Sequence, residues 1–213
     1  MNHERECLRS PNLILGSDPK EFYVWVDPTD FLVRHNAGLV GVFTCGPMPG
    51  VDAGTSKLMF IPNPKFSAHI SPFQHGMIRA YLADYNLELT RAEYFPRYPS
   101  RLDACFLLQN AETAHQYEAA HPEHVKGRSL KQVVTEGTHV YSIHDAGWID
   151  FLRGPGSKDQ ETLKAVGDRY WSGQPAAGPF TFMGEETEIA SVPEVLLYGS
   201  IRFVNRDLAV SDA

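Results

Sequence analysis

The stretch PEVLLYGSIRF, residues Pro193–Phe203, decides the fold of this chain. A single glutamate, Glu194, stands at its head, and the following residues are mainly Val, Leu, Tyr and Ile, which are enriched in β-strands. The pattern predicts a buried strand over residues 194–204 that begins with one carboxylate. A side chain at the start of a buried strand is held in place better than one on a loop.

A second stretch, FLLQNAETAHQY at residues 106–117, predicts a strand followed by a helix. Its apolar beginning belongs to a strand expected at 102–108. Asn110 is a favourable N-cap residue, and a helix is expected over Ala111–Ala120. The stretch therefore predicts that Tyr117 is carried on a helix that directly follows a strand.

The remaining elements are expected from hydrophobic periodicity and from turn residues. In chain order they are a strand at 21–27, a short helix at 29–36 ended by Gly38, a helix over Pro72–Tyr94, a strand at 138–143, a helix opened by a capping box of Ser157 and Gln160, and a linker rich in Gly and Pro before Glu194. Strands and helices are interspersed without regular βαβ spacing, so the expected fold class is mixed α+β.

Composition limits the class of protein. With 213 residues, 43% of them hydrophobic and 21% charged, the chain is long enough for one good core. We expect a single domain over 1–213, with a loosely ordered extension at 1–20 and an irregular loop at 38–72. Every apolar run ends well short of the about 18 residues of a membrane span, and the N-terminus has no apolar segment typical of a signal peptide. The three cysteines form no CxxC pair. We therefore expect a cytoplasmic protein with reduced thiols and no membrane partner.

Charge and motifs exclude several other classes of function. The net charge of −7 argues against a protein that binds nucleic acid by neutralising phosphates. Nine histidines are present, but no HExxH motif and no His–carboxylate spacing typical of a metal site occurs, so no metal is expected. The glycine-rich phosphate loops and the GxSxG nucleophile elbow are also missing from the sequence.

Together the two stretches resemble the ADP-ribosyltransferase superfamily, in its His–Tyr–Glu branch. In that fold an aromatic residue on a helix and a glutamate on a strand close a cleft for NAD. The resemblance implies a split mixed β-sheet core with flanking helices. It also implies NAD as the substrate, whose ADP-ribose is transferred to a macromolecular acceptor while nicotinamide is released.

The resemblance also implies roles for two residues. Glu194 would stabilise the oxocarbenium-like transition state and hold the ribose 2′-hydroxyl, and Tyr117 would stack on nicotinamide. The residues alone leave two alternatives open, which are an ordinary glutamate at a strand edge and a tyrosine packed against the core.

The longer run FPRYPSRLDACFLLQNAETA, residues 95–114, is similar to an uncharacterised bacterial branch of the superfamily. The resemblance places Ser100 and Arg101 at the phosphates or ribose of NAD, where an arginine can form paired hydrogen bonds. The opening strand of the family carries a His or Arg that grips a ribose, and here Val24 takes that place. Tyr23 or Trp25 would then contribute from the same strand.

Two other functions remain open. Because valine cannot hydrogen-bond a ribose, Val24 favours a catalytically inactive binding module on the same fold that recognises a protein or a nucleotide. His144 and Asp145 resemble the His–Asp pair of a metal-dependent phosphohydrolase, although that fold is helical and this dipeptide ends a strand. If the chain is a transferase, we expect a protein acceptor rather than nucleic acid. By family analogy alone, small members from bacteria and phages are often toxins or defence factors.

Overall fold

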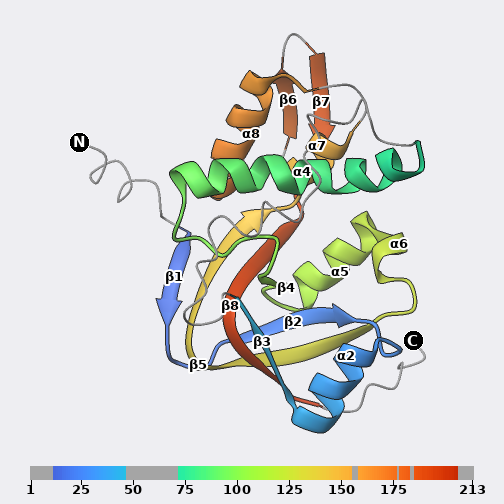
Figure 1. Ribbon diagram of the computed structural model, residues 1–213, viewed down its shortest axis with the longest axis vertical. Coiled ribbons are helices and arrows are strands. Elements are labelled where there is room, and N and C mark those ends of the chain that lie inside the picture. Colours follow the sequence, from blue (N-terminus) through green and yellow to red (C-terminus); the bar gives the residue numbers. More distant parts are fainter. Residues whose placement is uncertain (1–11, 47–71, 155–157, 177, 183–184, 206–213) are drawn as a thin grey trace.

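The computed structural model describes residues 12–46, 72–154, 158–176, 178–182 and 185–205 (Figure 1). The described strands are β1 (Leu13–Gly16), β2 (Glu21–Val26), β3 (Val42–Cys45), β4 (Cys105–Leu107), β5 (Ser129–Asp145), β6 (Gly178–Phe182), β7 (Glu185–Ile189) and β8 (Pro193–Phe203). The described helices are α2 (Phe31–Val33), which continues into the π-helical segment η1 (Arg34–Val40), α4 (Pro72–Tyr94), α5 (Ala111–Ala120), α6 (Pro122–Val125), α7 (Gly147–Arg153) and α8 (Gln160–Trp171).

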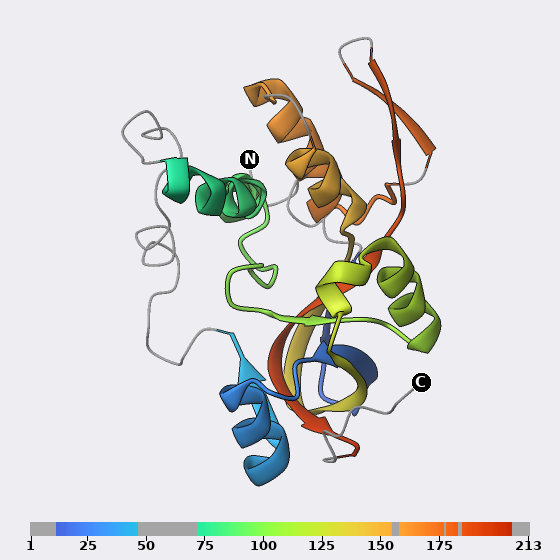
Figure 2. The same cartoon turned by 90° about the vertical axis from the view of Figure 1, so that its right-hand side faces the viewer.

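One six-stranded sheet forms the centre of the structure, and β5 and β8 are its two long strands. Strands β1 and β2 pair with successive parts of β5, whereas β3 and β4 pair with successive parts of β8. A bridge between Tyr23 and Leu108, with both N–O distances 2.8 Å, also joins β2 to the end of β4, so the sheet curls (Figure 2). The α+β class is confirmed. The described strand pairs are all antiparallel, whereas a mixed sheet was expected.

Strand β8 contributes to two hydrophobic cores because successive side chains of a strand point to opposite faces. Val195 and Leu197 lie in the core inside the curled sheet. Leu196 lies in the second core, which is formed with α4, α7 and α8 and contains the fully buried Trp171. Figure 1 shows these helices and the β6–β7 hairpin stacked at one end of the sheet, with α5 and α6 beside it.

Two helices have the predicted bounds. Helix α4 spans Pro72–Tyr94, and α5 spans Ala111–Ala120. The side chain of Asn110 accepts a hydrogen bond from the backbone of Thr113 (2.8 Å), and the Thr113 hydroxyl accepts one from the backbone of Asn110 (3.2 Å). This reciprocal cap satisfies two backbone donors at the start of α5. It fixes where the helix that carries Tyr117 begins.

The first short helix differs from its prediction at both ends. It begins at Phe31, because the side chain of Asp30 accepts a hydrogen bond from the backbone of Val33 (3.0 Å). It continues through Val40 in a π-helical segment and ends at Gly41, whose φ of 82° lies in the left-handed region. Gly38, the predicted terminator, lies inside this segment. The terminator is the glycine that adopts the left-handed conformation.

Other predicted bounds were also wrong. The extension at 1–20 includes β1, which pairs with β5 from Leu13 onward. The strand expected at 138–143 is part of the 17-residue β5, and the strand expected at 102–108 is reduced to β4 because residues 101–104 form a turn. The linker before Glu194 contains the β6–β7 hairpin. Asp159 caps α8, whereas Ser157 lies outside the described residues, as does 47–71 of the expected loop.

Helices α4 and α8 approach each other closely at a glycine. A Cβ atom on Gly167 would lie only 2.6 Å from the hydroxyl oxygen of Thr90, so only glycine fits there. Cys45 and Cys105 are free thiols, and Cys7 lies outside the described residues. Among the helices that the structure describes, none combines the length and the apolar character that crossing a membrane requires.

Candidate active site

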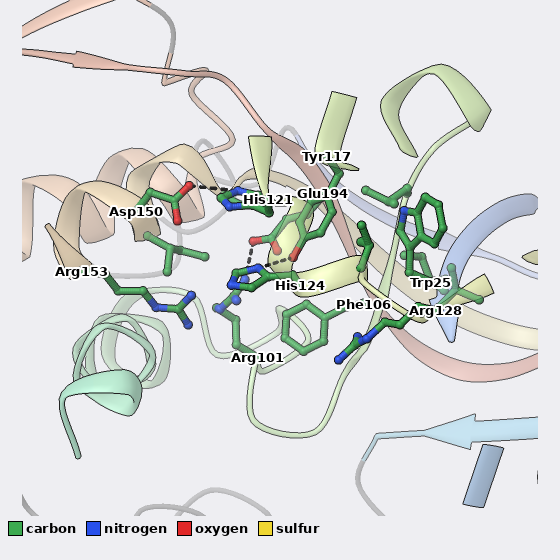
Figure 3. A pocket seen from close by; sticks show the side chains of 16 residues that line it. Trp25, Arg101, Phe106, Tyr117, His121, His124, Arg128, Asp150, Arg153 and Glu194 are labelled. Atoms are coloured by element: carbon green, nitrogen blue, oxygen red, sulfur yellow. Dashed lines mark hydrogen bonds and ion pairs between the residues drawn. The ribbon is translucent and has the colours of Figure 1, made fainter. Parts of the chain in front are cut away.

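A cavity of about 230 Å³ lies where the start of β8, strand β2 and helices α5 to α7 meet (Figure 3). Four of the six site residues predicted from the sequence line it, namely Glu194, Tyr117, Trp25 and Arg101. Tyr23 and Ser100 do not line it. Val24, the residue that departs from the family pattern, does. Figure 3 shows Glu194 between Asp150 and Arg153 on one side of the cavity and Trp25 on the other.

Glu194 is held rigidly although it borders the cavity. Its side chain begins on β8, and the residue is 6% exposed. Its Oε1 atom accepts hydrogen bonds from the Tyr170 hydroxyl (2.6 Å) and from Nη1 of Arg101. Its Oε2 atom has no hydrogen-bond partner in the described part of the chain. One carboxylate oxygen is therefore anchored, and the other is left for a ligand.

Arg101 joins Glu194 to a second carboxylate. Its Nε atom donates to Asp84 of α4 (2.7 Å), and its Nη1 atom also donates to the Tyr170 hydroxyl (2.9 Å). Burial alone would lower the pKa of the guanidinium, but Glu194, Tyr170 and Asp84 raise it well above its ordinary value. The ring of Phe106 lies 4.7 Å from its Cζ atom and covers one face. Arg101 is thus a permanent cation whose main role is to position Glu194.

The loop after α4 places Arg101. The guanidinium of Arg91 donates to the carbonyl oxygens of Pro96 and Tyr98 (both 3.1 Å) and pairs with Glu88 (2.9 Å). The hydroxyl of Ser100, which is fully buried, donates to the same Glu88 (2.8 Å). Ser100, predicted as a ligand of the phosphates or ribose, is used inside the fold to fix the residue before Arg101.

His144 contacts Tyr170 through its ring and through a hydrogen bond, and both contacts help to hold Tyr170 in place. The two rings stack with centroids 4.5 Å apart, and Nδ1 of His144 donates to the carbonyl oxygen of Tyr170 (2.8 Å). This tautomer follows because a carbonyl can only accept. Burial, and then the nearby Glu194 charge, raise the pKa of Tyr170 well above its ordinary value despite the opposing charge of Arg101. The Tyr170 hydroxyl therefore stays protonated and donates a hydrogen bond to Glu194.

His144 and Asp145 are both occupied inside the fold. The second ring nitrogen of His144 bonds to the Ser142 hydroxyl (2.7 Å). The carboxylate of Asp145 accepts four hydrogen bonds, from three backbone amides and from the hydroxyl of Ser191. Both residues are buried and neither lines the cavity. Both side chains of the His–Asp dipeptide therefore have structural roles, and neither is placed for the hydrolase chemistry considered above.

The burial of His144 predicts a pH dependence of stability. Burial lowers its pKa from the ordinary 6.5 to about 3. Between these values the unfolded chain binds a proton that the folded chain does not, so the free energy of unfolding falls as the pH is lowered. The loss is up to about 1.4 kcal/mol per pH unit. Urea denaturation between about pH 6 and pH 4 should give a shallower slope for His144→Gln than for the wild type.

The control for this prediction is His115→Gln, because His115 is 66% exposed on α5. That variant should keep the wild-type slope. If His144→Gln also keeps it, the folded protein accepts a proton at this position and the assignment of a neutral imidazole is wrong.

Tyr117 belongs to a cluster of three aromatic rings that the sequence did not predict. Its ring centroid lies 4.9 Å from that of His121, and the rings of His121 and His124 are 5.0 Å apart and nearly parallel. The Tyr117 hydroxyl lies 3.2 Å from Nδ1 of His124. Burial and the neighbouring His121 lower the pKa of His124, so His124 is a neutral acceptor for the Tyr117 proton.

Five ionisable side chains of the cavity lining were not among the predicted site residues, namely His121, His124, Arg128, Asp150 and Arg153. Nε2 of His121 lies 3.2 Å from Oδ2 of Asp150, which stands on α7. His121 sits at the junction of α5 and α6, and no local pattern in the sequence marks it as a partner of Asp150. Within the residues that the structure describes, no group of three or more His, Cys, Asp or Glu side chains could hold a metal ion.

No protein-family model matches the chain, and no curated protein gives a significant match to it. Its function therefore has to be inferred from the site itself.

Proposed function

We propose that this protein is an NAD-dependent ADP-ribosyltransferase that transfers ADP-ribose from NAD to a macromolecular acceptor and releases nicotinamide. The observation that carries the proposal is the buried Glu194 at the start of β8. Arg101 and Tyr170 hold one of its oxygens, while the side chain borders a cavity that Tyr117 also lines.

The reaction requires a fixed negative charge beside the ribose. Cleavage of the bond between nicotinamide and C1″ of the ribose creates positive charge on the sugar. A preorganised carboxylate stabilises that charge without rearranging during the reaction. In this proposal Oε2 of Glu194 serves the ribose, because Oε1 already binds Arg101 and Tyr170.

In this proposal, other lining residues contact the remaining parts of NAD. Tyr117 and Trp25 offer aromatic rings to nicotinamide, and stacking contributes about 0.5–1.5 kcal/mol beyond buried area. Arg101 is already paired with Glu194 and Asp84. We therefore assign the phosphates of NAD to Arg128, which lines the cavity and forms no ion pair with a described residue. The volume of about 230 Å³ is below the about 300 Å³ of the smallest typical ligand pockets. The enclosed part therefore suits the nicotinamide riboside half of NAD.

A protein is the preferred acceptor. The net charge of −7 disfavours a nucleic acid, whose binding depends on neutralised phosphates.

A catalytically inactive binding module is the second candidate, and Val24 favours it. Val24 lines the cavity at the place where the resemblance expects a His or Arg, and its side chain offers no hydrogen bond to a ribose. Such a module would bind a nucleotide or a protein at the same cavity without breaking a bond.

Thermal unfolding with and without NAD separates these candidates. If the concentration of NAD is about 100 times its dissociation constant, its binding to the folded protein adds about 2.7 kcal/mol to the free energy of unfolding. For a chain of this size that raises the midpoint by about 5–10 °C. A rise together with nicotinamide release supports the transferase. A rise without any nicotinamide release supports the binding module, and an unchanged midpoint contradicts the NAD site. His115→Ala, on the exposed face of α5, should respond to NAD as the wild type does.

A further inference from the structure

The cavity contains a histidine–carboxylate pair that the proposed chemistry of Glu194 does not use. It consists of His121, between α5 and α6, and Asp150 on α7, whose Nε2 and Oδ2 atoms are 3.2 Å apart (Figure 3). Both residues line the same cavity as Glu194. The imidazole is 16% exposed and the carboxylate 40%, so the histidine is mostly buried while its carboxylate partner reaches water.

The surroundings of His121 favour one tautomer of its ring. Its ring centroid lies 4.9 Å from that of Tyr117 and 5.0 Å from that of His124, and those two rings are 6.3 Å from each other. Because Nε2 lies 3.2 Å from a carboxylate oxygen, which can only accept, the neighbouring Asp150 favours the neutral tautomer with its proton on Nε2. The lone pair is then on Nδ1, which has no hydrogen-bond partner among the described residues. A histidine oriented by a carboxylate in this way is the usual arrangement of a general base.

Glu194 is poorly placed to take a proton itself. Its Oε1 atom accepts from Arg101 and Tyr170, so a proton there would displace one of these donors. Its Oε2 atom is assigned above to the ribose. A different group must therefore remove the proton of a neutral acceptor, and His121 with Asp150 is the available pair in the described cavity lining.

We propose that His121 is the general base that activates the acceptor, and that the acceptor is a neutral hydroxyl group, such as a serine or threonine side chain of a protein. This inference rests on the proposed transferase function. The acceptor oxygen forms a bond to C1″ of the ribose as the bond from C1″ to the nicotinamide nitrogen breaks. Nicotinamide leaves with the electron pair of that bond. The hydroxyl proton passes to Nδ1 of His121, and Asp150 balances the imidazolium charge.

The charges around the cavity support a hydroxyl acceptor over the alternatives. Arg101 and Arg153 are paired with carboxylates, but Arg128 lines the cavity without an ion pair to a described residue and would repel a cationic arginine or lysine acceptor. A carboxylate acceptor has no proton to lose and needs no base. His124 stays neutral, since burial and His121 lower its pKa, so it adds no second positive charge beside the imidazolium. The other ionisable neighbours are the Tyr117 hydroxyl and the Glu194 carboxylate.

The test uses water as the acceptor and azide as a nucleophile that needs no base. Nicotinamide release from NAD by His121→Ala should fall about 10²-fold relative to wild type, which is typical of a lost general base. Sodium azide should restore the rate and yield ADP-ribosyl azide, detectable by mass spectrometry. Asp150→Asn should show a smaller loss and the same rescue, and it serves as the second variant if His121→Ala folds poorly. His115→Ala, on the exposed face of α5, should keep the wild-type rate.

The outcomes separate this inference from the function on which it rests. If the wild type releases no nicotinamide, the proposed transferase fails. If the wild type is active but His121→Ala keeps its rate, only the role of His121 is wrong. If His121→Ala is slow, still gains thermal stability from NAD and is not rescued by azide, His121 has a structural or ligand-binding role instead. A loss of the NAD-dependent stabilisation in that variant would equally overturn its role as a base.

Discussion

Nicotinamide release from NAD should be about 10³-fold slower in Glu194→Gln than in the wild type. Removal of one preorganised electrostatic contact to a transition state costs about 10²–10³ in rate, and here the lost contact is a full charge. The amide has the size of the carboxylate, and its oxygen can still accept a hydrogen bond from Tyr170. Arg101 keeps its bond to Asp84 (2.7 Å). The substitution therefore removes the negative charge beside the ribose and preserves the shape of the site.

Two measurements show whether the loss is one of catalysis. The thermal stabilisation of Glu194→Gln by NAD should remain close to that of the wild type, because aromatic stacking and phosphate contacts are unchanged. The matched control is Glu136→Gln on β5, whose carboxylate is 42% exposed and pairs with Arg202. That variant should keep full turnover. Full turnover in Glu194→Gln as well would rule out the proposed role of Glu194.

The elements that could be predicted from the sequence are those with local signals. Helix α4 carries apolar residues at helical spacing, and α5 has its cap, Asn110, next to it in the chain. Strand β8 begins with a run of β-forming residues at 195–198. The end of the first helix was misplaced because a glycine that terminates a helix and one that lies inside it look alike in sequence. Only the backbone conformation of Gly41 distinguishes it from Gly38.

The contacts that build the site depend on residues far apart in the chain, and no local pattern reveals them. Arg101 and Glu194 are 93 positions apart, and Arg101 and Tyr170 are 69 positions apart. The resemblance places Arg101 at the phosphates or ribose of NAD, yet the fold pairs it with two carboxylates. Tyr170 is not among the predicted site residues, because its hydrogen bond to Glu194 joins residues 24 positions apart and becomes visible only in the folded chain.

Arg101→Met should lower the free energy of unfolding by about 3–5 kcal/mol, the usual cost of removing one partner from a buried ion pair. The guanidinium of Arg101 is 8% exposed and lies between Asp84 and Glu194, whose side chains are 12% and 7% exposed. Methionine fills much of the same volume but leaves Glu194 without a balancing charge. Asp84 retains a bond to Arg153 (3.0 Å). Urea denaturation of the variant and the wild type at neutral pH measures the difference.

A second substitution identifies the source of this loss. In the double variant Arg101→Met/Glu194→Gln the unbalanced buried charge is gone, so the double variant should be more stable than Arg101→Met alone. The surface counterpart is Arg202→Met, which breaks an ion pair with Glu136 whose side chains are 44% and 42% exposed. It should cost no more than about 1 kcal/mol, since water already screens exposed pairs. Equal losses in Arg101→Met and Arg202→Met would mean that Glu194 is not held by a buried charge. The carboxylate would then lack the rigid support that the proposed catalysis requires.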